Sequence, residues 1–217
     1  MTKTAQQHLE RGDKLAWLQH RKTAALEEYQ AALHLEPRMA EAHWRIGQIH
    51  YFAKKKDVAA ALAAFEAAAD ARRDWNEGHL WRANALADLG RYAEAEDSCR
   101  EAVRLGPEDT RPHISLGSCL SKMGRHAEAI MCYREGLRLG PAYGEMAAHL
   151  MLADAYKENG QIAEAISQWR IVAETKPVWD YEDDNPAHAR KMLTQYDREY
   201  SDPERGGPDG SGRAENR

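Results

Sequence analysis

The chain has 217 residues, of which 43% are hydrophobic and 30% are charged, and its formal net charge is −5 at pH 7. This composition is typical of a folded globular protein. The absence of a net positive charge argues against nucleic acid as a partner, because nucleic-acid binding depends on a positive surface. No apolar run approaches the length of a membrane span, and the first residues lack the apolar core of a secretory signal. We therefore expect a cytoplasmic protein with no membrane insertion and no nucleic-acid partner.

Along the chain, one pattern recurs five times. Its marker is an alanine, with steps of 36, 34, 34 and 36 residues, at Ala25, Ala61, Ala95, Ala129 and Ala165. Four residues after each marker stands a large or apolar residue: Tyr29, Phe65, Cys99, Tyr133 and Trp169. At least twelve residues before each marker stands a small residue: Gly12, Gly47, Ala83, Gly117 and Ala153. A period of about 20–50 residues is the signature of a stacked repeat array.

Each repeat is interpreted as a helical hairpin. The small residue and the marker alanine lie where the two helices cross, because close helix axes leave no room for longer side chains. A proline near the end of most repeats stops the second helix. The predicted helices span residues 4–17, 22–35, 39–53, 57–72, 75–89, 92–105, 109–123, 126–139, 145–159 and 162–175.

The pattern of small residue, alanine, aromatic, small residue and proline at a 34-residue period resembles the tetratricopeptide repeat (TPR) family. The resemblance implies an all-α, right-handed α-solenoid of five TPR-like helical hairpins whose first helices line a concave groove. Two hairpins depart from the pattern at the turn between their helices. The first has Gln19-His20-Arg21 in place of a turn glycine, and the second has a turn two residues longer, at 52–56.

The repeats are expected at residues 4–37, 38–73, 74–107, 108–143 and 144–177, which together form one array over 4–177. After the array, Ala189, Met192, Leu193 and Tyr196 form one apolar stripe, which predicts a capping helix within 178–200. The segment 201–217 has no large apolar residue and is predicted to be a disordered tail.

A histidine occupies the same position in every repeat, four residues before the small residue: His8, His43, His79, His113 and His149. A ladder of histidines suggests a metal site, but neighbouring first helices lie about 10 Å apart, whereas metal ligands lie about 2 Å from the ion. We therefore predict that each ring packs between helices and hydrogen-bonds a nearby backbone or hydroxyl group, with no metal and no cofactor. Metal or small-ligand binding through these histidines stays open as an alternative.

Apart from the side chains that face the second helix of the hairpin, each first helix carries another stripe of side chains. The resemblance places this stripe in the groove. The candidate partner-binding residues are Trp17, Glu41, Trp44, Gln48, Tyr51, Phe52, Glu77, Trp81, Asn84, Asp88, Arg111, Ser118, Lys122, Asp154 and Lys157. Aromatic residues gather in the N-terminal half, where they are either interface anchors or ordinary packing. Acidic residues dominate the first three repeats, so a basic, apolar-anchored segment of a partner would match them unless these charges are merely solvated.

The sequence contains no catalytic motif of the kinds that bind nucleotides, activate a serine or hold zinc. Its cysteines, Cys99, Cys119 and Cys132, have no CxxC spacing and are interpreted as reduced core residues. We expect a non-enzymatic adaptor or scaffold that binds a peptide or helix of a partner protein in the groove. The alternative is a self-assembling module that forms homo-oligomers.

Overall fold

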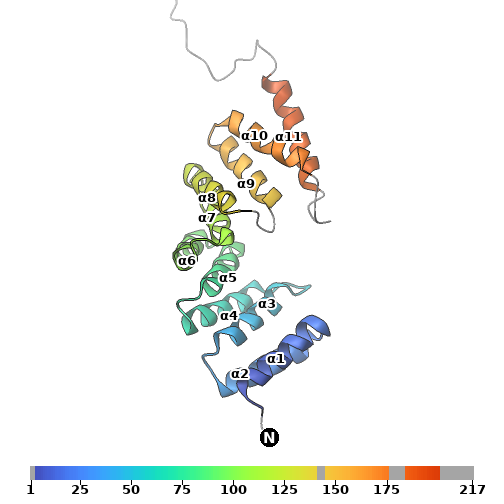
Figure 1. The fold of residues 1–217 in the computed structure, drawn as a ribbon, viewed down its shortest axis with the longest axis vertical. Helices are drawn as coiled ribbons and strands as arrows, with labels where there is room; N and C mark the ends of the chain where they lie inside the picture. Colours follow the sequence, from blue (N-terminus) through green and yellow to red (C-terminus); the bar gives the residue numbers. More distant parts are fainter. Residues whose placement is uncertain (1–2, 141–144, 176–183, 201–217) are drawn as a thin grey trace, which may run out of the picture. The chain divides into compact units, whose positions relative to one another are not determined.

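The computed structural model describes residues 3–140, 145–175 and 184–200, with side chains of the last segment described up to Tyr196. Every regular element within these ranges is helical (Figure 1), which confirms the predicted all-α solenoid class. The predicted disordered tail, 201–217, and the junctions at 141–144 and 176–183 lie outside the described residues. The described chain forms two compact units, Met1–Gly140 and Pro141–Arg217, and each is treated separately below.

The first unit contains four helical hairpins. Their helices are α1 (Ala5–Asp13), α2 (Lys22–Leu35), α3 (Ala40–Tyr51), α4 (Val58–Ala71), α5 (Asn76–Asp88), α6 (Tyr92–Leu105), α7 (Thr110–Lys122) and α8 (His126–Arg138). A short π-helix, η1 (Lys14–Leu18), continues α1. Each helix packs on the next along the chain from α1 to α8. Together with α9 and α10 of the second unit, every helix ends within two residues of its predicted range when η1 is counted with α1.

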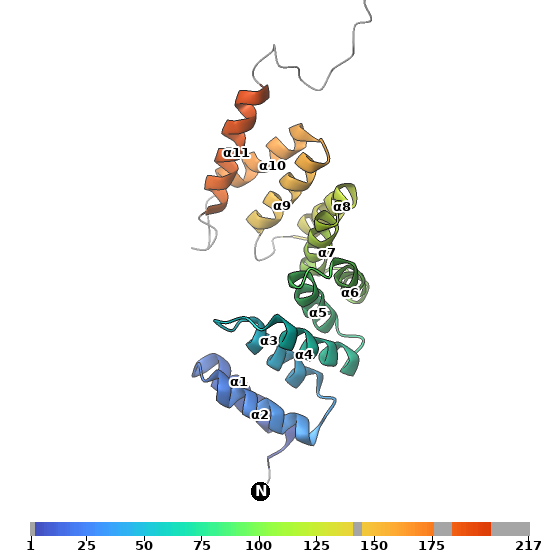
Figure 2. The same cartoon turned by 180° about the vertical axis from the view of Figure 1, so that it is seen from behind.

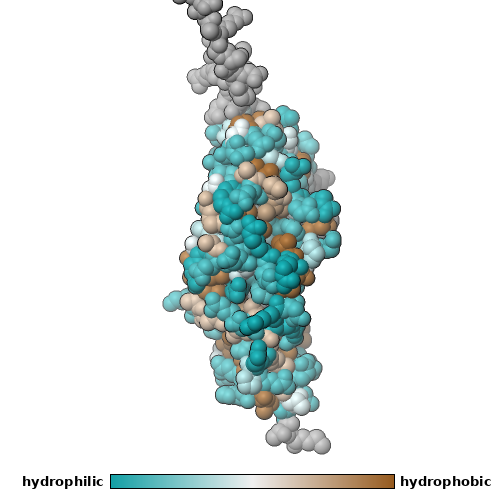
Figure 3. Space-filling model, turned by 90° about the vertical axis from the view of Figure 1, so that its left-hand side faces the viewer, coloured by the Kyte–Doolittle hydropathy of each residue, from teal (hydrophilic) through white to brown (hydrophobic). Residues whose placement is uncertain are grey.

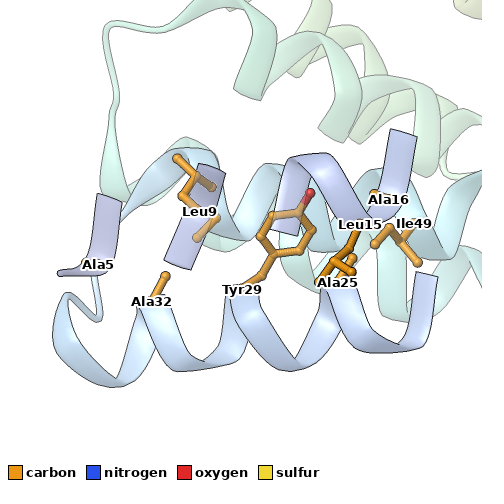
Figure 4. Packing of buried hydrophobic residues seen from close by; sticks show 9 residues of the cluster. Ala5, Leu9, Leu15, Ala16, Ala25, Tyr29, Ala32 and Ile49 are labelled. Atoms are coloured by element: carbon orange, nitrogen blue, oxygen red, sulfur yellow. The ribbon is translucent and has the colours of Figure 1, made fainter. Parts of the chain in front are cut away.

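The crossing point of each hairpin is tightly packed. All five marker alanines are fully buried, at 0% exposure. In the first hairpin, the Tyr29 ring projects from α2 toward α1 among small and aliphatic side chains (Figure 4). Its hydroxyl donates a hydrogen bond to Asp13 at 2.7 Å. The recurring alanine therefore marks the place where the helices come closest, as the sequence predicted.

The small residue upstream of the marker is required by the aromatic ring opposite it. A Cβ placed on Gly47 would lie 2.5 Å from the Phe65 ring, and one on Gly117 would lie 2.7 Å from the Tyr133 ring. Both distances are too short for carbon atoms, so only glycine fits while the ring keeps its position. We call this pairing of glycine and facing ring the crossing lock.

The third and fourth hairpins turn through glycine. Gly90 and Gly124 have φ angles of 75° and 77°, in the left-handed region that glycine adopts at the ends of helices. The following amides, of Arg91 and Arg125, each donate 2.9 Å hydrogen bonds to the last turn of the preceding helix. These backbone bonds satisfy carbonyls that the helix end would otherwise leave free.

The first two hairpins turn differently because each contains extra residues. Twelve residues separate the small position from the marker in the third and fourth hairpins, but thirteen separate Gly12 from Ala25. The π-helical turn of η1 takes up this one added residue. His20 then occupies the position of the turn glycine, with a φ angle of 55°. In the second hairpin, two added residues form the longer turn 52–57 between α3 and α4.

The second unit contains α9 (Glu145–Glu158), α10 (Ile162–Glu174) and α11 (Asp184–Tyr200). Helix α11 packs mainly on α10 and also on α9. The Tyr196 ring stacks on the Trp169 ring at 5.1 Å, and Arg190 donates a 3.1 Å hydrogen bond to the carbonyl of Ala173. Ala189 is completely buried in this contact. Helix α11 therefore covers the last hairpin, in the manner of the predicted capping helix.

Candidate functional site

The odd-numbered helices of the first unit are the first helices of their hairpins. Helix α5 packs against α3 on one side and against α7 on the other, in addition to its own hairpin partner α6. The candidate residues of repeats one to four lie on these helices or at their C-terminal ends. We call the surface they form the inner face. The remaining candidates, Asp154 and Lys157, lie on α9 of the second unit.

A cluster of aromatic rings joins α3 to α5 on the inner face. Trp81 packs edge-on against Tyr51 at 5.6 Å and against Phe52 at 5.4 Å. It also stacks on the buried ring of Phe65 at 5.6 Å. Each contact lies within the range of favourable aromatic pairs. The structure thus brings three sequence-predicted candidates together and anchors them on the hairpin core.

A second aromatic contact lies at the opposite end of α3. Trp44 packs edge-on against Trp75, which immediately precedes α5, at 5.5 Å. The guanidinium groups of Arg45 and Arg72 lie over the Trp44 and Trp75 rings, each at 4.6 Å. Trp44 is therefore held between neighbouring hairpins, which is the packing role left open for the N-terminal aromatic residues.

The aromatic candidates differ in how much surface they present. Trp44, Tyr51 and Trp81 are half-buried, whereas Phe52 keeps 51% and Trp17 keeps 43% of its surface exposed. An exposed ring beside buried rings is held in position by packing and still offers area to a partner. Phe52 fits this description best, because Tyr51 and Trp81 both support it.

The carboxylates of the inner face are paired with cations of the same chain. Asp13 accepts from Arg45 at 2.9 Å, and Glu77 accepts from Arg111 at 2.7 Å. Two further ion pairs involve these carboxylates: Glu41 pairs with Arg72 within the second hairpin, and Asp88 pairs with Lys56 of the preceding hairpin. The acidic character of repeats one to three is therefore largely neutralised. This removes the reason for expecting a basic partner segment.

Uncharged polar groups bridge the same helices. Ser115 on α7 donates a 3.0 Å hydrogen bond to Asn84 on α5. Gln48, only 9% exposed, accepts from Arg45 at 3.1 Å. Ser118 is half-buried and Lys122 exposed near the end of α7. Among these candidates, Asn84 therefore joins neighbouring hairpins, Gln48 bonds within its own helix, and Lys122 is exposed to solvent.

The environment of the inner face strongly shifts the pKa of one candidate residue, Tyr51. Burial raises the pKa of Tyr51 above its ordinary value, and the hydrogen bond with Asp88 raises it further. The phenol therefore keeps its proton throughout the physiological range and acts as a neutral donor.

In the second unit, burial raises the pKa of Asp154, an effect that Lys157 opposes. Lys157 itself pairs with Glu158 at 2.9 Å. These two candidates form a local charge group on α9.

Each histidine of the ladder has its own protein partner. His43, His79 and His113 bind the backbone carbonyl six residues earlier, at 2.9, 3.0 and 3.2 Å. His8 and His149 instead bind side chains of the second helix of their hairpin, Glu28 at 2.7 Å and Gln168 at 2.8 Å. The predicted backbone hydrogen bond is confirmed for His43, His79 and His113. For His8 and His149 the predicted backbone or hydroxyl partner is wrong, because a carboxylate and an amide side chain lie within reach. Across the described residues, no group of three or more His, Cys, Asp or Glu side chains is placed to hold a metal ion.

Two of the three cysteines lie in the core, as predicted. Cys99 and Cys119 are buried at 0% and 2% exposure, and Cys132 is half-buried. The hydrogen bond with Cys119 and burial both raise the pKa of Cys99. A protonated, enclosed thiol is a poor nucleophile, so Cys99 behaves as a small apolar residue.

Sequence reasoning missed one surface of the first unit. The end of α1 with its turn (residues 14–22) and the turn after α3 (residues 52–56) lie side by side in Figures 1 and 2. The Lys22 ammonium group donates a 3.0 Å hydrogen bond to the carbonyl of Phe52, which joins the two segments. We call this surface the basic edge. The available signal in the sequence was the excess residues in both turns.

Hydrophobic residues are also distributed over other parts of the surface. On the face shown in Figure 3, hydrophobic residues lie in small separate groups among hydrophilic ones. Within the ranges that the structure describes, no helix is both long and apolar enough to cross a membrane.

Comparison with known proteins gives the family and the fold. The sequence profile of the tetratricopeptide repeat matches residues 14–76, 52–110 and 116–170, which is well over half of the chain. No sequence among curated proteins matches the chain.

Similar solved structures include a MamA protein, with a TM-score of 0.69 and 18% identity over 90% of this chain and 97% of that one. YrrB, described as a TPR protein with an unusual peptide-binding site, has a TM-score of 0.69 and 22% identity over 86% and 92% of the two chains. TTC0263, a thermophilic TPR protein of Thermus thermophilus, has a TM-score of 0.64 and 21% identity over 88% and 100%. At these identities the structures share the fold alone. The repeated pattern, the stacked hairpins and the profile match agree that the chain belongs to the tetratricopeptide repeat family.

Proposed function

We propose that this chain is an interaction module that binds a peptide or helix of a partner protein on the inner face of its first unit. Members of the family are generally protein-interaction scaffolds without enzymatic activity. The observation that carries the proposal is the aromatic cluster of Tyr51, Phe52 and Trp81, in which supported rings present surface beside polar groups.

The physical support is preorganisation. The Trp81 ring is fixed by three ring contacts, and its indole N–H donates to Glu77 at 3.0 Å. Glu77 is in turn held by Arg111. A partner that contacts this surface does not need to order these side chains, so little conformational entropy is lost on binding. The peptide-binding site described for YrrB, which shares the fold, is consistent with this use of the scaffold.

A peptide-display selection against the purified chain tests the proposal. The dissociation constant of each selected peptide is then measured by calorimetry for wild type, Phe52→Ala and Asn84→Ala. Both variants should weaken binding, Phe52→Ala by about tenfold or more, because truncating an anchor residue costs about 2 kcal/mol.

The matched control is Met131→Ala, which removes a side chain that is 70% exposed on α8, away from the inner face. Equal affinity for wild type and both inner-face variants would refute binding at this face. Sedimentation of the free chain over a range of concentrations separates partner binding from self-assembly, the alternative function.

A further inference from the structure

The basic edge, residues 14–22 and 52–56, combines positive charge with exposed apolar side chains. It contains six lysine or arginine residues and no aspartate or glutamate. Trp17, Leu18 and Phe52 keep 43%, 76% and 51% of their surfaces exposed. Scattered exposed apolar residues need no explanation, but several of them in two adjoining segments rich in cations do.

Several of these cations lack a counter-ion. Among the described residues, Lys14, Arg21, Lys54 and Lys55 have no carboxylate partner. Lys56 differs, because it pairs with Asp88 and lies 3.7 Å from the centre of the Tyr51 ring. Lys56 is thus held in place by Asp88 and Tyr51, whereas those other cations carry a charge that no carboxylate of the described residues neutralises.

The equivalent turns of the next two hairpins show that this charge is not a general property of the fold. There the cation after the turn glycine is neutralised by a glutamate three residues later. Arg91 pairs with Glu94 at 2.6 Å, and Arg125 pairs with Glu128 at 2.7 Å.

The first two turns lack this neutralisation. The position three residues after Arg21 holds Ala24, so the glutamate of the regular turns has no counterpart there. In the second hairpin, Asp57 follows the lysine turn, but its side chain caps α4 by accepting a 3.0 Å hydrogen bond from the amide of Ala60. The free cations of the basic edge are therefore particular to these two hairpins.

We propose that the basic edge is a docking surface for an acidic peptide segment of a partner protein, with an apolar side chain that contacts Trp17 and Phe52. Opposite charge on the partner would supply the attraction and the orientation, and the exposed rings would supply the buried apolar area. This surface borders the inner face at Phe52, and at Tyr51 and Asp88 through Lys56. Its unpaired cations lie outside the aromatic and polar groups between α3, α5 and α7.

An extended peptide fits the edge better than a membrane surface does. A membrane-binding helix presents a continuous apolar face along its length. Here the apolar residues stand at a helix end and in a turn, next to exposed Gln19 and His20. Individual side chains of a peptide can meet this broken pattern of rings and cations, whereas an acyl layer cannot.

The test uses the full chain and a short fluorescein-labelled peptide of aspartate and glutamate residues around one tryptophan. Fluorescence anisotropy should show binding that weakens as salt is raised, because the free cations lie at the surface. The double variant Lys54→Glu/Lys55→Glu should weaken binding by about tenfold or more. Both side chains are exposed and without ion pairs, so circular dichroism should show an unchanged fold.

The control Arg134→Glu reverses an exposed charge on α8, outside the basic edge, and should bind the peptide as wild type does. The proposal is overturned if the double variant binds as tightly as wild type, or if Arg134→Glu weakens binding equally. Cosedimentation with phosphatidylserine vesicles in the absence of peptide binding would assign the edge to a membrane instead, and would also overturn the proposal. Asn84→Ala, which tests the inner face, should leave this peptide's affinity unchanged, so failure of one proposal is distinguishable from failure of the other.

Discussion

The third and fourth hairpins differ from the first two in the turn between their helices, although all four have a fully buried marker alanine where the helices cross. In the regular hairpins, glycine takes the left-handed position and a glutamate neutralises the following arginine. In the first two hairpins, extra residues replace this arrangement with a π-helical turn and a longer lysine turn. The helix crossing accepts only small residues at its contact positions, whereas the turn accepts insertions because solvent surrounds it.

This difference shows where the fold leaves room for function. Residues added at a crossing would displace a close-packed ring, but residues added at a turn change only what the surface presents. The two altered turns are also the ones that bring unpaired cations and exposed rings together.

The largest effect is expected at the crossing lock. Gly47→Ala and Gly117→Ala would place a Cβ against the rings of Phe65 and Tyr133, respectively. Each should lower the free energy of unfolding by about 1–3 kcal/mol, the usual cost of overpacking a core. Urea denaturation followed by circular dichroism measures this, with the exposed Ala63→Ser as control. If the crossing is common to regular and irregular hairpins, the two glycine variants will be affected similarly.

A smaller loss is expected at the regular turn. Gly124→Ala meets no atom within 4 Å, so its cost comes from the backbone alone. A left-handed alanine costs about 1–2 kcal/mol. The same denaturation experiment measures it, and a wild-type midpoint would show that the turn does not need glycine.

In the first hairpin, introducing glycine at the turn should raise the free energy of unfolding, whereas removing glycine from the regular turn should lower it. His20 holds the left-handed conformation with a side chain, so His20→Gly relieves the backbone while loosening the unfolded chain. The net result should be a stabilisation of between zero and about 1 kcal/mol. Gln19→Gly, where φ is −110°, supplies the control and should destabilise. If His20→Gly lowers the free energy of unfolding as much as Gly124→Ala does, the left-handed positions of the two turns do not behave as equivalent.

The smallest effect concerns the charge network of the regular hairpins. Burial would raise the pKa of Glu96, but hydrogen bonds from Arg100 and Arg125 outweigh it and hold the pKa below its usual range. Because the folded-state pKa is depressed, the stabilisation is present above the ordinary glutamate pKa and is lost as pH falls through the folded value.

Glu96→Gln should therefore be less stable than wild type at pH 7, by less than about 1 kcal/mol. The difference should shrink toward pH 3, as thermal unfolding at both pH values would show. The neighbouring exposed Asp97→Asn is the matched control. A difference that persists unchanged at pH 3 would mean that the ion pairs do not stabilise the fold.

Much of the fold could be predicted because the crossing constrains residue size at fixed spacing. Ala95 and Ala129 are fully buried for the same geometric reason. The 34-residue spacing between them gives the repeat period, from which the positions of the remaining helices follow. The π-helical turn at Lys14–Leu18 was not foreseen, although the added residue after Gly12 was visible in the sequence. Periodicity shows that a residue has been added but does not say whether a helix or a loop will absorb it.

For the candidate site, the sequence could predict which residues belong to it but not which of them contact one another. That Trp81 would support Phe52 while Trp44 packs on Trp75 depends on neighbouring hairpins, which no single repeat specifies. In the same way, the acidic residues suggested a negative surface until Arg45 and Arg111 were found beside them. Charge patterns along one helix do not reveal the cation that the next helix supplies.

The sequence by itself determined the helices, the repeat register and the buried crossing, because these follow from residue size and local backbone preference at short range. Only the tertiary structure decided which side chains are paired and which remain exposed, since that depends on contacts between helices about thirty residues apart in the chain. The exposed rings and unpaired lysines of the first two hairpins therefore form one surface only because the fold brings their turns together.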